Sequence, residues 1–399
     1  MQEVKVMTEK IYYQDAGVMT ATAKVKASGT DGKGNYAVLD RSCFYPEGGG
    51  QPADTGVIGQ TEVRDVLLVD GEIRHYTEDK LEIGEYHIAI DWERRFDHMQ
   101  QHTGQHLLSA VFEDELGMAT KSFHLGAERV SIDLDVREIS SGQLYEVEQQ
   151  VNSLIYSQIP IETEWVTQSQ AAEMKLRKEP AVEGDIRLVK VAGIDINACG
   201  GTHVHNTGQL GLLKIIRTEK AKTGTRVYFL CGHRAMKHFR LLQSVTDQLT
   251  KSLNAPAAEL AGAAAAVLDD RKEKEKQLKK LALELVKLEA ESLKPDGNII
   301  VRNYSGRPIK EIQQLAKLAI ENHPSIYLLF IVPEEESVRF VCAKGKNAAG
   351  DMKEILGEIV EAKGGKVGGN ESLAQGGGPL DDNLEFYSEA FQNKIKEIA

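Results

Sequence analysis

The sequence predicts an α+β protein of several domains, and three observations lead to that prediction. The chain has 399 residues, 41% of them hydrophobic, which leaves room for more than one buried core. Strand-like alternation dominates the first part of the chain, whereas strands and helices mix further on. A charged, leucine-rich helical stretch separates the two mixed regions. We therefore expect four domains, at residues 1–92, 93–240, 241–294 and 295–399.

Residues 1–92 are expected to form a β-rich, barrel-like domain. The segment "TATAKVKA" (20–27) alternates in the manner of a half-buried strand. In "VRDVLLVDGEIRHYTE" (63–78), Asp70 and Gly71 stand between two strand-like runs, which is a strong signal for a two-residue hairpin. Together these patterns indicate a small antiparallel sheet or barrel.

Residues 93–240 mix helical and strand patterns and predict an α+β domain. Helices are expected at "HMQQHTGQHLLSAVFEDEL" (98–116) and "SGQLYEVEQQVNSLIYSQ" (141–158). Strands are expected at "RVSIDLDV" (129–136), "RLVKVAGIDI" (187–196) and "TRVYFLCG" (225–232).

Residues 241–294 predict a helical linker, and residues 295–399 predict a separate α/β domain. Leu278, Leu281, Leu285 and Leu288 keep a heptad-like spacing, which favours a helical hairpin or short coiled coil. Strand patterns at 298–304, 325–332 and 338–345 then precede a helical pattern at 348–365. The tail "GGKVGGNESLAQGGG" (364–378) fits a backbone surface that approaches RNA and fits a mobile loop equally.

Composition excludes several classes of protein. A net charge of −12 argues against non-specific binding to a polyanion, which rests on Lys and Arg, although a basic cluster lies between residues 214 and 226. The N-terminus has no signal-peptide pattern and no apolar run is long enough to span a bilayer, so we expect a cytoplasmic protein without membrane contact. The four cysteines lie far apart, which predicts reduced thiols.

His102 and His106 form the first candidate metal-binding pair. They stand four residues apart at the start of an apolar-periodic helix, and side chains at that spacing share one helical face. Both imidazoles could therefore coordinate one ion, although two histidines at this spacing also arise by chance. His98 lies one further turn back and is expected to support the pair or to lie on the surface.

Cys199 and His203 form the second pair, in "CGGTH". Taken alone, Cys199 could be a metal ligand, a nucleophile or a small core residue. Gly200 and Gly201 let the backbone curl around an ion, and one thiolate with three imidazoles suits Zn²⁺ better than Mg²⁺ or Ca²⁺. His205 could compete as a ligand and is expected to lie outside a saturated site.

Two other classes of enzyme share parts of this pattern. A zinc metalloprotease of the HExxH type needs Glu directly after the first His, and here that position is Thr103. A cysteine hydrolase would use Cys199 as nucleophile with a histidine base, which the neighbouring histidines leave formally open.

Three ordered motifs resemble a known family. "LDRSCFYPEGGGQPADTG" (39–56), "HTGQH" (102–106) and "CGGTHVHNTGQLG" (199–211) resemble the editing region of alanyl-tRNA synthetase, and most closely its stand-alone relatives, the AlaX-type alanyl-tRNA editing hydrolases of the long form. The tail at 364–378 resembles the end of the DHH-associated domain that closes these proteins. The resemblance covers nearly the whole chain.

The resemblance implies an activity and a cofactor. Members hydrolyse the ester that joins a wrong amino acid, usually serine or glycine, to alanine tRNA. Residues 93–240 would be the zinc-binding editing domain, with one Zn²⁺ per chain held by His102, His106, Cys199 and His203. The glycine-rich loop begins so early that no aminoacylation core is expected before it, so the protein should edit tRNA without charging it.

The resemblance also suggests residues that contact the substrate. Ser122 would line the pocket and contact the substrate, at a position where the synthetases often have glutamine. His124 would act as an acid, a base or a phosphate contact, or would simply be a histidine at a strand edge. The loop of Gly48, Gly49, Gly50 and Gln51 would contact the substrate or form a tight turn.

The expected partner is mischarged alanine tRNA, with contact through the C-terminal domain and a homodimer formed through the same region. The alternative function is a non-catalytic tRNA-binding or regulatory module derived from alanyl-tRNA synthetase. A DHH-type phosphoesterase would need an Asp-His-His triplet, and the sequence contains none.

Overall fold

The chain folds into two compact units, Met1–Gln248 and Leu249–Ala399. The computed structural model describes residues 7–178, 184–222, 224–380 and 383–398. An α+β protein with more than one unit is thus confirmed, while the finer division into four domains stays a prediction. Among the described residues, no helix is both long enough and apolar enough to cross a membrane.

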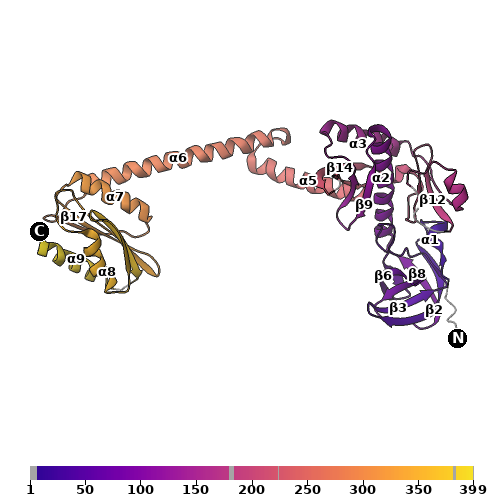
Figure 1. Ribbon diagram of the computed structural model, residues 1–399, viewed down its shortest axis with the longest axis horizontal. Helices are drawn as coiled ribbons and strands as arrows, with labels where there is room; N and C mark the ends of the chain where they lie inside the picture. The colour runs from indigo at the N-terminus through magenta and orange to yellow at the C-terminus, as the bar shows by residue number, and fades with distance from the viewer. Residues whose placement is uncertain (1–6, 179–183, 223, 381–382, 399) are drawn as a thin grey trace. The chain divides into compact units, whose positions relative to one another are not determined.

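The first part of the N-terminal unit is a closed β-barrel, as the alternating pattern predicted (Figure 1). Around the barrel the strands follow the order β2-β3-β7-β6-β5-β8. Their bounds are β2 (Thr20–Asp31), β3 (Gly34–Leu39), β5 (Gly56–Ile58), β6 (Thr61–Val69), β7 (Glu72–Thr77) and β8 (Gly84–Ile90). Asp70 and Gly71 join β6 to β7 with φ of 51° and 85°, which is the backbone that a two-residue hairpin turn requires.

A short segment before the barrel packs against the barrel core. Strand β1 (Glu9–Lys10) pairs in parallel with β4 (Arg41–Ser42), and helix α1 (Ile11–Gln14) follows it. Tyr12 of α1 is buried in the barrel core together with Phe44 and Tyr45. The barrel core therefore extends under the loop that leads to the glycine-rich segment.

Helix α2 (Trp92–Leu116) leaves the barrel and contacts two further sheets (Figure 1). Asp91 caps its first turn by accepting a hydrogen bond from the Arg94 amide, and Gly117 ends it in the left-handed conformation at φ 66°. The first sheet has the order β14-β15-β10-β9, and the second has the order β11-β12-β13.

The elements of this region enclose two cores, one shared with α2 and a smaller one formed by β11, β12 and α4. The strands are β9 (Thr120–Leu125), β10 (Val130–Leu134), β11 (Ile161–Val166), β12 (Ile186–Val191), β13 (Asp195–Ala198), β14 (Leu213–Ala221) and β15 (Gly224–Cys231). The helices are α3 (Ser141–Tyr156), α4 (Gln168–Ala172) and the 3₁₀ turn η1 (Thr207–Leu210). The predicted strand at 187–196 is in fact two antiparallel strands, because Gly193 turns the chain at φ 73°.

A buried ion pair joins α2 to the barrel. Arg95 and Asp54 both have fully buried side chains, and Nε of Arg95 donates to the Asp54 carboxylate at 3.0 Å. The same guanidinium donates to the carbonyl oxygens of Ala16 at 2.9 Å and Cys43 at 2.6 Å. One side chain thereby holds the helix, the barrel and the segment before the barrel together.

The C-terminal unit contains a five-stranded sheet with helices on both faces (Figure 1). The sheet order is β16-β17-β18-β20-β19, with β16 (Ile299–Asn303), β17 (Tyr327–Pro333), β18 (Ser337–Lys344), β19 (Lys366–Gly369) and β20 (Leu373–Pro379). Alternate residues of the central strands face two separate cores. The end of α6 (Leu260–Ser292) and α7 (Ile309–Asn322) cover one core, and α8 (Met352–Glu361) and α9 (Leu384–Ile398) cover the other.

The glycine-rich tail and the helical linker differ in part from what the sequence predicted. The glycine-rich tail at 364–378 is not a loop, because most of it lies in strands β19 and β20. The residues predicted as a helical linker lie largely in two helices, α5 (Gly232–Leu253) and α6, while their role as a linker and their pairing stay predictions.

Removal of one partner of the buried ion pair should destabilise the N-terminal unit. Asp54→Ala leaves Arg95 charged and unpaired in the interior, which costs about 3–5 kcal/mol of unfolding free energy. Both tryptophans, Trp92 and Trp165, lie in this unit, so urea unfolding followed by tryptophan fluorescence reports it. Arg64→Ala removes an exposed barrel ion pair and should cost less than about 1 kcal/mol. Equal costs for the two variants would contradict this assignment.

Candidate metal centre

Four side chains from two segments of the N-terminal unit converge on one point. Helix α2 supplies His102 and His106, one turn apart, and the loop after β13 supplies Cys199 and His203. One donor atom from each of the four lies within 4.8 Å of all the others. The three imidazoles are buried, and the thiol is half-buried.

The spacing of the donor atoms fits a small tetrahedral ion. Zinc binds sulfur at about 2.3 Å and nitrogen at about 2.0 Å, so tetrahedral sulfur and nitrogen ligands lie about 3.5 Å apart. Sγ of Cys199 lies 3.5 Å from Nε2 of His102 and 3.3 Å from Nε2 of His203. These four side chains could therefore hold a metal ion.

Each imidazole of the cluster has a hydrogen-bond partner at its other nitrogen. Three bonds join Nδ1 to a neighbouring oxygen: His102 to Oε1 of Gln51 at 3.0 Å, His106 to Oδ2 of Asp195 at 2.9 Å, and His203 to Oγ1 of Thr103 at 3.1 Å. With Nδ1 engaged in this way, Nε2 of each ring is the nitrogen available to a metal.

Gln51 also holds the loop that carries Cys199 and His203. Its Oε1 accepts a hydrogen bond from the Thr202 amide at 3.0 Å, and its Nε2 donates to Oγ1 of Thr202 at 2.8 Å. The side chain is 1% exposed, so both ends of the amide are used inside the protein. The structure thus gives Gln51 an orienting contact with His102, and its predicted contact with substrate stays a prediction.

The backbone of the loop also packs tightly against the cluster. A Cβ on Gly201 would lie only 2.2 Å from Cε1 of His102, so no larger residue fits there without a shift. Arg187 of β12 donates to the carbonyl oxygens of Cys199 at 2.8 Å and Gly201 at 2.9 Å. The loop is therefore fixed through its main chain as well as through its side chains.

The surroundings of the cluster favour the thiolate form of Cys199. Burial would raise the pKa of the Cys199 thiol, but the His102 and His203 rings beside it lower the pKa well below its ordinary value. Burial would lower the pKa of His106, but its bond to Asp195 and its contact with Cys199 raise the pKa to about 10. Burial lowers the pKa of His203 to about 3. A thiolate thus forms readily here, and a thiolate is the form of cysteine that binds metals.

A cavity of ≈ 420 Å³ opens onto the cluster. Its wall includes three of the four donors, His102, His106 and Cys199. Gly49 and Ser122 line the same cavity, as predicted for the substrate pocket, although their contact with substrate stays a prediction. Gly49 and Gly50 adopt φ of 59° and 80° in a turn closed by paired bonds between Gly48 and Gln51.

His124 does not line this cavity. It lies on the edge strand β9, next to Phe123, whose ring stacks on His102 with centroids 5.3 Å apart. The His124 ring contacts Ser122, Asp133 and Arg226. Its role, as an acid, a base, a phosphate contact or a histidine at a strand edge, stays a prediction.

The two other histidines near the motifs stay outside the cluster. His98 is buried on α2, and burial lowers its pKa to about 3. His205 is exposed and lies 3.5 Å from Asp15. Neither belongs to the group of donors that could hold one ion.

The region of the site matches known aminoacyl-tRNA synthetase families. Residues 186–228, which include Cys199 and His203, match the family described as threonyl and alanyl tRNA synthetase second additional domain. Residues 1–94 match the family described as tRNA synthetases class II (A).

Curated relatives align with most of the chain. Alanyl-tRNA editing protein Aarsd1 of Danio rerio is 32% identical over 83% of this chain and 82% of its own length. Alanyl-tRNA editing protein AlaX-L of Pyrococcus horikoshii is 32% identical over 93% of this chain and 94% of its own length. This chain belongs to the alanyl-tRNA editing protein family. The family is related to alanine–tRNA ligases: that of Methanoregula boonei is 31% identical over 97% of this chain and 43% of the ligase.

One solved structure aligns with part of the chain. The C-Ala domain from Aquifex aeolicus alanyl-tRNA synthetase is 19% identical, covers 25% of this chain and 89% of that chain, and has a TM-score of 0.22. That score is too low to carry an argument about the fold.

The motifs of the editing family predict the four donors, but not the groups that orient them. Thr103 lies inside the motif at 102–106 and Asp195 just before the motif at 199–211, yet nothing in their spacing shows that they meet His203 and His106. Asp195 stands four residues before Cys199, at the start of β13, so a turn between β12 and β13 had to be recognised first.

The cluster should bind one divalent ion per chain, and the loss of any donor should weaken that binding. His106→Ala and Cys199→Ala each remove one of four donors, which should lower zinc affinity by more than about 100-fold, beyond the 10–100-fold cost of losing an outer hydrogen-bond partner. Chelator competition on the purified variants measures this affinity. His205→Ala, an exposed histidine next to the same loop, is the control and should bind zinc like the wild type. Wild-type affinity in Cys199→Ala would refute the donor set.

Proposed function

We propose that this chain is an aminoacyl-tRNA hydrolase that removes wrongly attached amino acids from alanine tRNA in trans. The reaction adds water across the ester: the bond between the acyl carbon and the ribose oxygen breaks, releasing the amino acid and a tRNA with a free hydroxyl. The observation that carries the proposal is the buried cluster of one thiol and three imidazoles at the wall of a cavity, in a chain of the alanyl-tRNA editing family.

We propose Zn²⁺ as the resident ion, held by His102, His106, Cys199 and His203. A set of one sulfur and three nitrogen donors suits zinc, whereas Mg²⁺ and Ca²⁺ prefer oxygen. When bound, such an ion polarises an ester carbonyl or lowers the pKa of a water molecule.

The protein's own groups would prepare the site for that chemistry. Gln51, Asp195 and Thr103 hold the three imidazoles by Nδ1, which fixes the ring orientations before substrate arrives. Cys199 is the most exposed of the four donors and faces the cavity, so an ester would approach the cluster from the cysteine side.

The wall of the cavity supports a polar amino acid as the group removed. Oγ of Ser109 accepts hydrogen bonds from Nε2 of Gln105 at 2.9 Å and from Oγ1 of Thr120 at 2.8 Å, and all three residues line the cavity. A site built to hydrogen-bond a substrate hydroxyl discriminates strongly against an analogue that lacks it. We therefore infer that seryl esters are preferred over alanyl esters.

Residues outside the metal centre would bind the tRNA. We propose that residues 93–240 form the editing domain, with Lys178 at the cavity providing a positive charge for the RNA backbone. The C-terminal unit would correspond to the DHH-associated domain and contact tRNA. Its strand β20 carries Gly376, Gly377 and Gly378 beside Arg339 in one hollow, and a backbone without side chains can approach RNA closely. Homodimerisation through this unit remains part of the proposal.

The decisive experiment is deacylation of purified alanine tRNA charged with serine, glycine or alanine. We expect seryl-tRNA to be hydrolysed at least about tenfold faster than alanyl-tRNA, and Cys199→Ala to lose at least about 100-fold in rate. A chelator should abolish the activity, and added Zn²⁺ should restore it. His205→Ala serves as the control at wild-type rate.

Two results would contradict the proposal in different ways. Tight binding of alanine tRNA with no metal-dependent hydrolysis would identify a non-catalytic tRNA-binding module. Hydrolysis that persists both in the presence of the chelator and in Cys199→Ala would show that the reaction takes place outside the metal centre.

A further inference from the structure

Asp195 connects one histidine of the candidate metal centre to Arg177, a residue outside it. Its side chain is fully buried, and both carboxylate oxygens are occupied. Oδ2 accepts from Nδ1 of His106 at 2.9 Å and from Nδ2 of Asn197 at 2.7 Å. Oδ1 accepts from Nε of Arg177 at 2.7 Å. The orientation of His106 therefore depends on a carboxylate that another side chain holds in place.

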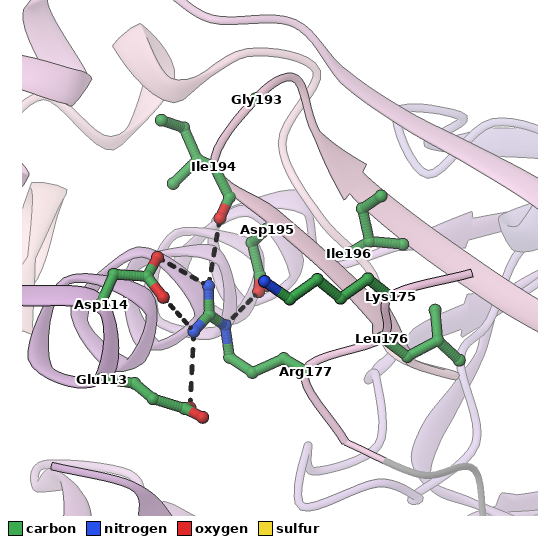
Figure 2. A pocket seen from close by; sticks show the side chains of 9 residues that line it. All are labelled: Glu113, Asp114, Lys175, Leu176, Arg177, Gly193, Ile194, Asp195 and Ile196. Carbon is green, nitrogen blue, oxygen red and sulfur yellow. Dashed lines mark hydrogen bonds and ion pairs between the residues drawn. The ribbon is translucent and has the colours of Figure 1, made fainter. Parts of the chain in front are cut away.

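The other hydrogen bonds of Arg177 go to α2 and to the turn before β13 (Figure 2). Its two terminal nitrogens donate to the two oxygens of Asp114 at 2.8 and 3.0 Å, and one of them also donates to the carbonyl of Ile194 at 3.1 Å. Glu113 lies 3.4 Å from the same guanidinium. The Arg177 side chain is only 14% exposed, so its ion pairs are partly shielded from water.

Arg177 bridges two carboxylates, one on α2 and one on β13. These two elements carry, or lead to, the four donors. Asp114 lies on α2, two helical turns beyond His106, and Asp195 begins β13, which leads directly to Cys199. The planar, forked guanidinium can engage a carboxylate with two parallel bonds and still present Nε to another. Arg177 thus sets the separation between the helix that carries two donors and the strand that leads to the other two.

We propose that Arg177 is a positioning residue for the metal centre, acting through Asp195 on His106 and through Asp114 on α2. The inference rests on the proposed function in one respect only, that the cluster binds a metal. Arg177 itself touches no donor atom. Its effect is to fix the carboxylate that orients the imidazole of His106. A group that bonds a ligand directly, as Asp195 does, is worth about 10–100-fold in metal affinity, so the loss of Arg177, one bond further out, should cost about the lower end of that range.

The chain offers a matched control in Arg234. Its guanidinium clamps Asp97, another carboxylate on α2, with Nε at 2.8 and 2.9 Å and a terminal nitrogen at 2.6 Å. Its side chain is 12% exposed, close to the 14% of Arg177. Arg234 contacts none of the four donors or their hydrogen-bond partners. Its removal therefore measures how much metal affinity falls when any arginine–carboxylate pair on α2 is lost.

The test is binding of Co²⁺ to the full-length wild type, Arg177→Gln, Arg177→Lys and Arg234→Gln, with the visible absorption spectrum and the dissociation constant as readouts. Arg177→Gln should weaken Co²⁺ about tenfold and change the spectrum, because the geometry at His106 relaxes. Arg177→Lys should recover only part of the loss, since an ammonium cannot span both carboxylates and the carbonyl. Arg234→Gln should match the wild type.

Further measurements keep the proposal open to refutation. If Arg177→Gln does not fold, Asp114→Asn removes the helix side of the bridge and should weaken Co²⁺ in the same direction. Wild-type affinity and spectrum in either variant, or equal weakening in Arg234→Gln, would overturn the positioning role. Failure of the wild type to bind Co²⁺ would overturn it together with the metal centre, whereas Co²⁺ binding without tRNA deacylation would overturn the proposed function alone.

Discussion

The candidate site depends on the hydrogen bonds that fix the far nitrogen of each imidazole. A free histidine ring can turn about its side-chain bonds and can present either nitrogen. Here Gln51, Thr103 and Asp195 each occupy one Nδ1, so the three Nε2 atoms face a common point with the Cys199 thiol. The partners come from the barrel loop, from α2 itself and from β13, so the whole N-terminal unit must fold before the donors meet.

The barrel is therefore part of the site, although none of its strands supplies a donor. The buried pair of Arg95 and Asp54 ties α2 to the barrel, and the loop that follows Tyr45 delivers Gln51 to His102. On the other side, Arg177 ties the far part of α2 to β13. The clamps made by Arg95 and Arg177 thus act on one helix, and the histidine pair lies between them.

Much of this arrangement could be predicted from the sequence. The contacts that could not be predicted join residues far apart in the chain. The hairpin at Asp70 and Gly71 follows from local turn preferences, and His102 and His106 share a helical face because of helical periodicity. The contacts of Asp195 and Gln51 instead join residues far apart in the chain, which no local pattern encodes.

The most direct test of the account is X-ray absorption at the zinc edge of the purified, zinc-loaded protein. Four converging donors predict a four-coordinate ion with one sulfur at about 2.3 Å and three imidazole nitrogens at about 2.0 Å, and loss of the sulfur shell in Cys199→Ala. A wild-type spectrum without a sulfur ligand, or with oxygen ligands in place of the imidazoles, would contradict the convergence of His102, His106, Cys199 and His203 on one ion.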